Sequence, residues 1–290
     1  MIVYFYGGLT KFKFDWWFNR EPVTGLVKAL PATHWMAPVL KTDFMISTLT
    51  YGGLLIDLLS PLLLWYKPVR RWALLPFCAF HLSNSQIFDD IGIFPFVMLS
   101  ALVLYFETPE IPLFRRLSTW PPATGKKDAG VKSPALPPGS LAARRFLLGY
   151  FVFQLLFPFR GFFLPNPMDW SGIARNFSWR MKVDTRAIEE MKFSLYDPAT
   201  GRTYPVDIRS FVNEMQMNNL ARDAGSVAAF ARMLRSEAAQ HGLPGAQVKA
   251  SIRVRYNNRP PQYFVNPDVD MAAAEYSPFR KLDWLMPLKE

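Results

Sequence analysis

Residues 45–66 read MISTLTYGGLLIDLLSPLLLWY, and Asp57 is the one charged residue among them. An α-helix rises about 1.5 Å per residue, so roughly twenty apolar residues reach across the hydrocarbon core of a bilayer. The sequence therefore predicts a membrane-spanning helix here. A lone carboxylate inside such a helix is costly and normally has a partner within the bundle. We expect Asp57 to be buried and paired, and to matter for packing more than for chemistry.

Three further apolar segments accompany this helix, at 1–11, 72–106 and 145–164. Polar residues at Ser83–Gln86 and at 89–92 interrupt the second of these segments, which predicts two short helices joined at a polar turn. Residues 117–140 are rich in Pro, Gly, Lys and Ser, a composition typical of a mobile linker. Residues 1–165 are therefore predicted to form a transmembrane helical bundle that contains this linker.

The formal net charge of +10 comes largely from two groups of basic residues. They are Lys67, Arg70 and Arg71 in one loop, and Arg115, Arg116, Lys126, Lys127, Lys132, Arg144 and Arg145 in or beside another. Such an excess marks the cytoplasmic side of a membrane protein, and it accounts for the charge without a nucleic-acid-binding surface. With both loops cytoplasmic, we expect Lys11, the polar turn and the residues after Leu164 on the exoplasmic side, around one pocket.

Residues 166–290 read as an ordinary charged domain. The expected elements are strands at Met191–Leu195 and Arg202–Ile208, helices at Val212–Leu220 and Ser226–Ala239, and strands at Val248–Tyr256 and Gln262–Val265. A turn signal, DPATG at 197–201, joins the first two strands as a hairpin, and NNRP at 257–260 joins the last two. The sequence predicts a small α+β soluble domain on the exoplasmic side.

Lys11 lies in the segment GGLTKFKFDW at 7–16, between apolar and aromatic residues. Burial in such surroundings disfavours the ammonium form of a lysine, and a neutral amine can act as a base near neutral pH. The alternative is that Lys11 and Lys13 extend from a helix end to the membrane surface as anchors.

Four separated motifs occur in the order in which one family has them. They are GGLTKFKFDW at 7–16, GGLLIDL at 52–58, FHLSNSQIF at 80–88 and YSPFRKLDW at 276–284, with His34-Trp35 and FSWRM at 177–181 in addition. From about residue 4 to residue 288 the chain resembles the vitamin K-dependent gamma-glutamyl carboxylases. Members of that family have further membrane helices before the lysine segment, so this chain is expected to lack the amino-terminal ones.

The resemblance implies an integral, multi-pass membrane enzyme of the carbon-carbon lyase class. In the family, a lysine deprotonates vitamin K hydroquinone, O2 is added, the oxygenated cofactor removes the γ-proton of a protein glutamate, and CO2 traps the carbanion while the epoxide forms. By its place in the motif, Lys11 corresponds to the lysine that deprotonates the hydroquinone, and Lys13 does not. The implied partners are a glutamate-containing protein or peptide and membrane lipid, with no nucleic acid.

His81, Asn84 and Gln86 are the expected cofactor-binding residues. They could hydrogen-bond the quinol oxygens or the glutamate carboxylate, or they could only satisfy backbone groups at the turn. The resemblance also assigns four residues to glutamate binding: Trp170, Arg175, Ser178 and Trp179. The chain departs from the animal-type members here, since Ala174-Arg175 replaces a Leu-Tyr pair and Asp184 replaces a histidine. Arg175 could receive a substrate carboxylate.

Other classes of function are less well supported. No phosphate-binding loop, nucleophile elbow or pair of metal-spaced cysteines occurs, and the three histidines are far apart in sequence, so no metal is expected. Cys78 is alone, which rules out an intrachain disulfide. A transporter would call for repeats and several intramembrane charges. The alternative that we retain is a quinone- or lipid-binding membrane protein of the same fold without carboxylase activity.

Overall fold

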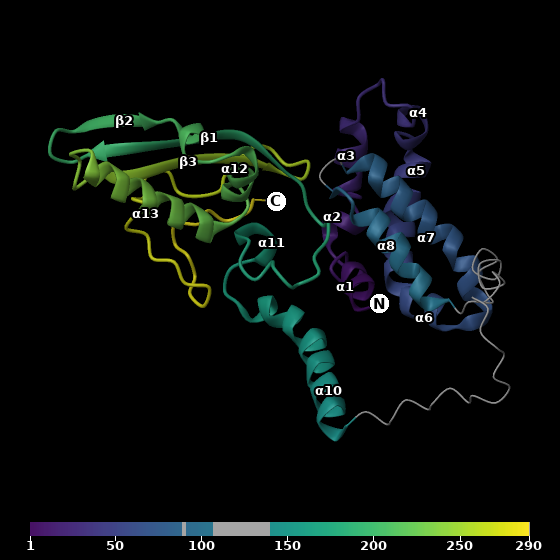
Figure 1. Ribbon diagram of the computed structural model, residues 1–290. Helices are drawn as coiled ribbons and strands as arrows, with labels where there is room; N and C mark the ends of the chain where they lie inside the picture. Colours follow the sequence, from purple (N-terminus) through teal and green to yellow (C-terminus); the bar gives the residue numbers. More distant parts are fainter. Residues whose placement is uncertain (89–90, 107–139, 290) are drawn as a thin grey trace, which may run out of the picture. The chain divides into compact units, whose positions relative to one another are not determined.

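The computed structural model describes residues 1–88, 91–106 and 140–289 (Figure 1). The chain forms two compact units, of which the first comprises Met1–Phe12 and Leu26–Leu156 and the second comprises Lys13–Gly25 and Phe157–Glu290. The sequence predicted a boundary between two domains at residue 165. In the structure, residues 13–25 and 157–165 belong to the second unit instead. The predicted linker at 117–140 lies, apart from Ser140, outside the described residues.

The first unit is helical. Its longer helices are α1 (Ile2–Leu9), α6 (Gly53–Trp65), α7 (Lys67–Ile87), α8 (Phe94–Leu102) and α10 (Leu141–Leu156), with short helices α3 (Val23–Ala29), α4 (Ala37–Leu40) and α5 (Asp43–Ser47). A π-helical turn at Thr48–Gly52 joins α5 to α6, so the helix predicted at 45–66 is confirmed as one continuous run.

Two helices among the described residues are long and apolar enough to cross a membrane, Asp43–Trp65 and Leu141–Phe163, and a shorter apolar helix covers Phe94–Tyr105. None of the residues of α10 is buried, and Phe146 is 72% exposed. A helix that presents apolar side chains to its surroundings on every face suits lipid better than water.

The two helices expected in this segment are confirmed as α7 and α8, but the part of the predicted turn at Ser83–Gln86 is wrong, because α7 continues through these residues to Ile87. The polar side chains are accommodated within the helix: Ser85 Oγ donates to the carbonyl oxygen of Leu82 at 2.7 Å. The interruption between the two helices falls later, between Ile87 and Phe94, so the first helix is longer than the polarity pattern indicates.

Two glycines allow α1 to approach α6 closely. A Cβ on Gly8 would lie 3.0 Å from the backbone nitrogen of Leu58, and a Cβ on Gly7 would lie 3.2 Å from Oδ2 of Asp57. Small residues at a helix contact let two backbones come together, as in membrane bundles. Lys11 follows the end of α1 directly, so this contact determines what the lysine can reach.

The second unit is an α+β domain with one antiparallel sheet in the order β2-β1-β3-β4. The strands are β1 (Arg186–Asp197), β2 (Arg202–Val206), β3 (Gln247–Tyr256) and β4 (Gln262–Tyr263), and the helices are α2 (Phe14–Trp17), α11 (Met168–Ser171), α12 (Glu214–Leu220) and α13 (Ala224–Gln240). Both predicted hairpins and both predicted helices are confirmed. Alternate residues of β3, from Val248 to Tyr256, are buried and form the core with the apolar face of α13.

Local chemistry explains these elements. The carboxylate of Asp197 accepts the backbone N–H of Ala199 at 3.0 Å, and Gly201 takes the positive φ that closes the hairpin. Asn213 caps α12 in a reciprocal pair with Gln216, and Asp223 caps α13. The sequence predicts the second unit well because its strand, turn and cap signals all agree.

Residues 13–25 join the second unit through charged contacts that the sequence pattern does not reveal. Arg259 donates two hydrogen bonds to the carboxylate of Asp15, at 2.6 and 2.9 Å, and Asn257 donates a third at 2.7 Å. Burial acts to raise the pKa of Asp15, but these donors hold it below its ordinary value. The segment after the lysine motif is therefore attached to the end of β3.

Candidate functional site

Lys11 is buried at the end of α1, with 5% of its surface exposed, and forms an ion pair with Asp57 of α6. The two side chains are each 7% exposed. The ring of Phe80, from α7, lies with its centroid 5.8 Å from Nζ of Lys11. The lysine is thus enclosed by apolar and aromatic groups rather than extended to the surface. Asp57 is buried and paired as expected, and its partner is the residue that the family motif marks as the base.

His81 follows Phe80 on α7. It is 2% exposed, and its Nε2 is hydrogen-bonded to the hydroxyl of Tyr4 from α1 at 2.6 Å. The rings of Phe77 and Phe80 contact Tyr4 and His81 edge-on, at centroid distances of 5.3 and 5.1 Å respectively. Tyr4 is a residue that the sequence analysis missed, since a tyrosine in an apolar stretch gives no signal of its own.

Asn84 and Gln86, the other two residues predicted to bind the cofactor, make different contacts from His81. Gln86 accepts a hydrogen bond from the indole N–H of Trp35 at 3.2 Å. Asn84 is half-buried in the last turns of α7, where its backbone carbonyl accepts the N–H of Phe88 at 3.0 Å. His81 therefore contacts α1 through Tyr4, next to Phe80, whereas Gln86 is hydrogen-bonded to Trp35 of the His34-Trp35 motif.

Three of the predicted substrate residues, Arg175, Ser178 and Trp179, lie on an irregular segment between α11 and β1, and Trp170 lies in α11. Four non-glycine residues of this segment have positive φ, namely Ala174, Phe177, Trp179 and Lys182, at 60°, 56°, 53° and 49°. Gly172 has φ +79°, and a Cβ there would lie 2.4 Å from the carbonyl oxygen of Arg222. Backbone strain of this kind concentrates at binding and catalytic sites.

Arg175 is paired with Asp184, with hydrogen bonds of 2.9 and 3.5 Å. The Asp184 side chain is fully buried, and Arg186 and Arg222 approach it at 3.8 and 4.0 Å. Arg175 and Asp184, two residues at which the chain departs from the animal-type pattern, are therefore in contact, and the charge of each is compensated by the other. The guanidinium of Arg175 already pairs with one carboxylate, and its side chain is 25% exposed.

Trp170 is a core residue, 1% exposed, and its indole N–H donates to the carbonyl of Met286 at 2.6 Å. The buried guanidinium of Arg186 lies over the rings of Trp170, Tyr256 and Phe264 at 5.0 to 5.5 Å. Burial lowers the pKa of Arg186 to about 10, so it stays protonated at neutral pH. In this structure Trp170 holds the segment in place and has no surface for a substrate.

Ser178 and Trp179 occupy different positions. Ser178 is buried, and its hydroxyl donates to the carbonyl of Arg175, which closes a turn. The indole N–H of Trp179 is buried and has no hydrogen-bond partner in the part of the chain that the structure describes. A buried donor without a partner is costly. Among the predicted substrate residues, Trp179 therefore has a buried donor without a partner in the described residues.

Two charged contacts support this segment. Arg180 donates two hydrogen bonds of 2.6 Å to Asp169 of α11, which also pairs with Lys13. Burial acts to raise the pKa of Asp169, but Lys13 and Arg180 hold it below its ordinary value. Arg160 donates to the carbonyls of Ala174, at 3.1 Å, and of Asn176. Sequence analysis gave no reason to single out Arg160 or Asp169.

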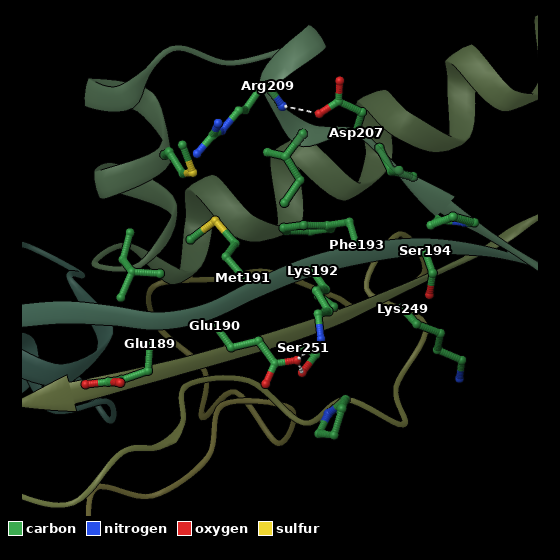
Figure 2. A pocket seen from close by; sticks show the side chains of 17 residues that line it. Glu189, Glu190, Met191, Lys192, Phe193, Ser194, Asp207, Arg209, Lys249 and Ser251 are labelled. Atoms are coloured by element: carbon green, nitrogen blue, oxygen red, sulfur yellow. Dashed lines mark hydrogen bonds and ion pairs between the residues drawn. The ribbon is translucent and has the colours of Figure 1, made fainter.

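A separate hollow of about 710 Å³ lies along β1. Figure 2 shows Met191 and Phe193 on one side of the strand and Glu190 with Ser251 on the other. None of the predicted site residues lines it. Among the described residues there is also no group of three or more His, Cys, Asp or Glu side chains arranged to hold a metal ion.

Comparison with protein families gives two matches. Residues 1–109 match the HTTM domain, and residues 141–290, more than half of the chain, match the lumenal domain of vitamin K-dependent gamma-carboxylase. The chain is a member of the vitamin K-dependent gamma-carboxylase family. The two matches cover the two parts described above, a helical amino-terminal part and a sheet-containing carboxy-terminal part. No solved structure matches the chain.

Membership of this family is consistent with a membrane protein that carries a lumenal domain. It is also consistent with a carboxylase-type function and with dependence on vitamin K. The lumenal match contains the whole irregular segment from Met168 to Asp184, and the HTTM match contains Lys11, Asp57 and His81.

Proposed function

We propose that this protein γ-carboxylates glutamate in a protein or peptide, using vitamin K hydroquinone, O2 and CO2, with Lys11 as the base. The observation that carries the proposal is the burial of Lys11 beside Asp57 and Phe80, at the position that the family motif marks. A surface anchor would be exposed, whereas Lys11 is 5% exposed.

The residues around Lys11 have the chemical properties that a binding site for a reduced naphthoquinone needs. An aromatic diol needs flat apolar contacts, hydrogen-bonding groups and a base, and Phe80, the Tyr4–His81 pair and Lys11 are of these kinds. When bound, the reduced cofactor supplies, with O2, the strong base that no side chain can provide for removing a glutamate γ-proton.

The role of the chain's own residues follows from this requirement. Lys11 Nζ accepts the proton of a quinol hydroxyl, which needs a neutral amine in an apolar setting. The buried aromatic groups keep water away, because water would quench a strong base before it reached the glutamate. Tyr4 and His81 hold each other in place beside the lysine, and they orient the cofactor through hydrogen bonds.

For the second substrate we propose the segment between α11 and β1. The free indole N–H of Trp179 donates to the peptide, while Trp170, Ser178 and the Arg175–Asp184 pair maintain the strained backbone that presents it. Arg175 then acts through Asp184 rather than by direct contact with the glutamate.

We further propose a multi-pass membrane protein with the carboxy-terminal domain on the exoplasmic side. Two groups of basic residues, at 67–71 in the first turns of α7 and at 115–145, support this orientation. Arg202→Cys and Lys126→Cys, each in a Cys78→Ser background, test it with a membrane-impermeant thiol reagent. Labelling from outside is expected at position 202 and not at 126, and the reverse pattern would invert the topology.

The experiment that tests the function is epoxide formation from reduced vitamin K, together with CO2 incorporation into a glutamyl peptide, by membrane-embedded protein. Lys11→Ala should reduce both to background, whereas Lys28→Ala, at an exposed lysine of α3, should change neither. Lys11→Ala leaves Asp57 buried without its ion-pair partner, so Lys11→Ala/Asp57→Ala, which removes both charges, separates loss of the base from loss of the fold. Activity that survives both variants would refute the role of Lys11.

One observation favours the alternative of a quinone-binding protein without carboxylase activity. Asp184 neutralises Arg175, so the substrate segment differs chemically from the animal-type pattern. Quinone binding together with failure to carboxylate any glutamyl peptide would support this alternative.

A further inference from the structure

The Lys11–Asp57 pair joins two sequence motifs that lie 46 residues apart. The pair is enclosed by three helices. Gly7 and Gly8 bring α1 against α6 at Asp57 and Leu58, and one turn before Asp57 a Cβ on Gly53 would lie 3.1 Å from the Phe80 ring of α7. Glycines at three contact points show that the space between these helices is small.

A base in such a place faces an energetic difficulty. An isolated lysine in an apolar site stays neutral readily, but its protonated form is strongly disfavoured there, so it accepts a proton poorly. A carboxylate in contact offsets this penalty, because the ammonium then forms an ion pair. The same logic applies to hydrolases in which an aspartate stabilises the protonated histidine and fixes its orientation.

We propose that Asp57 is the positioning residue of the base: its carboxylate holds Nζ of Lys11 and stabilises the ammonium formed when Lys11 takes a quinol proton. The step starts from the neutral amine of Lys11, after the proton of the resting ion pair has left to solvent; the quinol O–H bond breaks and an N–H bond forms at Lys11. The positive charge then lies against the Asp57 carboxylate, and the cofactor keeps the electron pair of the broken bond. The inference rests on the proposed function, and it revises the expectation that Asp57 matters for packing more than for chemistry.

Two other titratable groups of these helices, Tyr4 on α1 and His81 on α7, are hydrogen-bonded to each other. Both are neutral in their ordinary forms near neutral pH. Asp57 is the one acidic residue of the apolar run at 45–66, so α6 offers no second carboxylate to replace it.

The decisive measurement needs no cofactor and no turnover. Small amine-reactive acetic anhydride acetylates only neutral amines, and mass spectrometry of the peptide that carries Lys11 and Lys13 reports both residues at once. If Asp57 stabilises the ammonium, Asp57→Asn should displace the pH profile of Lys11 labelling to lower pH, with a labelling rate raised about tenfold or more below the wild-type midpoint. Lys13, whose partner is Asp169, should label as in the wild type.

Asp57→Glu keeps a carboxylate and should restore the wild-type labelling profile for Lys11. Asp43→Asn makes the same chemical change at an exposed position of α5 and should leave the profile unchanged. The rate of epoxidation by Asp57→Asn should fall about tenfold or more, and the acidic limb of the curve of this rate against pH should move to lower pH. A purely structural role would lower activity without moving either profile.

Two outcomes overturn the inference. One is a Lys11 labelling profile that is the same in the wild type and in Asp57→Asn, including no reaction in either. The other is an Asp57→Glu variant that matches Asp57→Asn in labelling although it is as stable as the wild type. Absence of epoxidation by the wild type would instead refute the proposed function, while the labelling comparison would still report on the pair.

Discussion

The pair formed by Arg175 and Asp184 allows a quantitative test of the second unit. Asp184 has no exposed side-chain surface, whereas Arg175 is 25% exposed and can reach water. If Arg175 is replaced by Leu, Asp184 keeps Arg186 at 3.8 Å and Arg222 at 4.0 Å. If Asp184 is replaced by Asn, the buried side chain of Arg186 loses the carboxylate that lies 3.8 Å from it. The two substitutions should therefore differ in cost.

Breaking a buried ion pair from one side costs about 3 to 5 kcal/mol when the remaining charge is left uncompensated. Asp184→Asn approaches this case and should cost about 3 kcal/mol of unfolding free energy. Arg175→Leu should cost about 1 to 2 kcal/mol, because two arginines still compensate Asp184 and because Arg175 is partly solvated. With roughly 2 to 4 °C per kcal/mol for a domain of this size, the melting temperature should fall by about 6 to 12 °C and 2 to 8 °C respectively.

Thermal unfolding in detergent, followed by tryptophan fluorescence, measures both variants and the double variant. The double variant should be more stable than the sum of the single losses predicts, by about 1 kcal/mol. Lys192→Gln, which removes an ion pair from a lysine that is 75% exposed, serves as the control and should give no measurable change. Additive losses, or a larger loss for Arg175→Leu than for Asp184→Asn, would refute the argument that burial of Asp184 decides the cost.

Three further predictions concern the same domain. Trp179→Phe removes the indole N–H and keeps a ring, so the KM for a glutamyl peptide should rise up to about tenfold at unchanged melting temperature; an unchanged KM would remove Trp179 from the peptide site. Lys13→Ala should retain epoxidation, because Arg180 still pairs with Asp169; a loss equal to that of Lys11→Ala would show that both lysines are anchors. The pKa of Asp169 lies below its ordinary 3.8, so its contribution to stability is present above about pH 4 and is lost as the pH falls further; Asp169→Asn should flatten the acid side of the curve of melting temperature against pH.

The sequence by itself determined the order of the elements and the chemistry to expect. Hairpin turns, helix caps and alternating strands are local signals, and for this reason the predicted strands at 191–208 and 248–265 and the helices between them match the structure. The apolar run around Asp57 likewise predicts its own helix, and the ordered motifs identify the family and single out Lys11. Where a local signal was ambiguous, as at Ser83–Gln86, hydrogen bonding within the helix decided against the turn.

Tertiary structure decided which residues meet, because partners far apart in sequence leave no local pattern. Nothing in the sequence near Asp57 names Lys11 as its partner; two glycines of α1 bring the pair together by letting the helices approach. The two departures from the animal-type pattern, Arg175 and Asp184, become one feature only when the fold places a buried carboxylate against the guanidinium. The resemblance assigns both Trp170 and Trp179 to one substrate segment, but the two residues differ in the structure. Trp170 is a core residue whose indole N–H is hydrogen-bonded, whereas the buried indole N–H of Trp179 has no partner in the described residues. Burial and hydrogen-bond satisfaction depend on the packed structure.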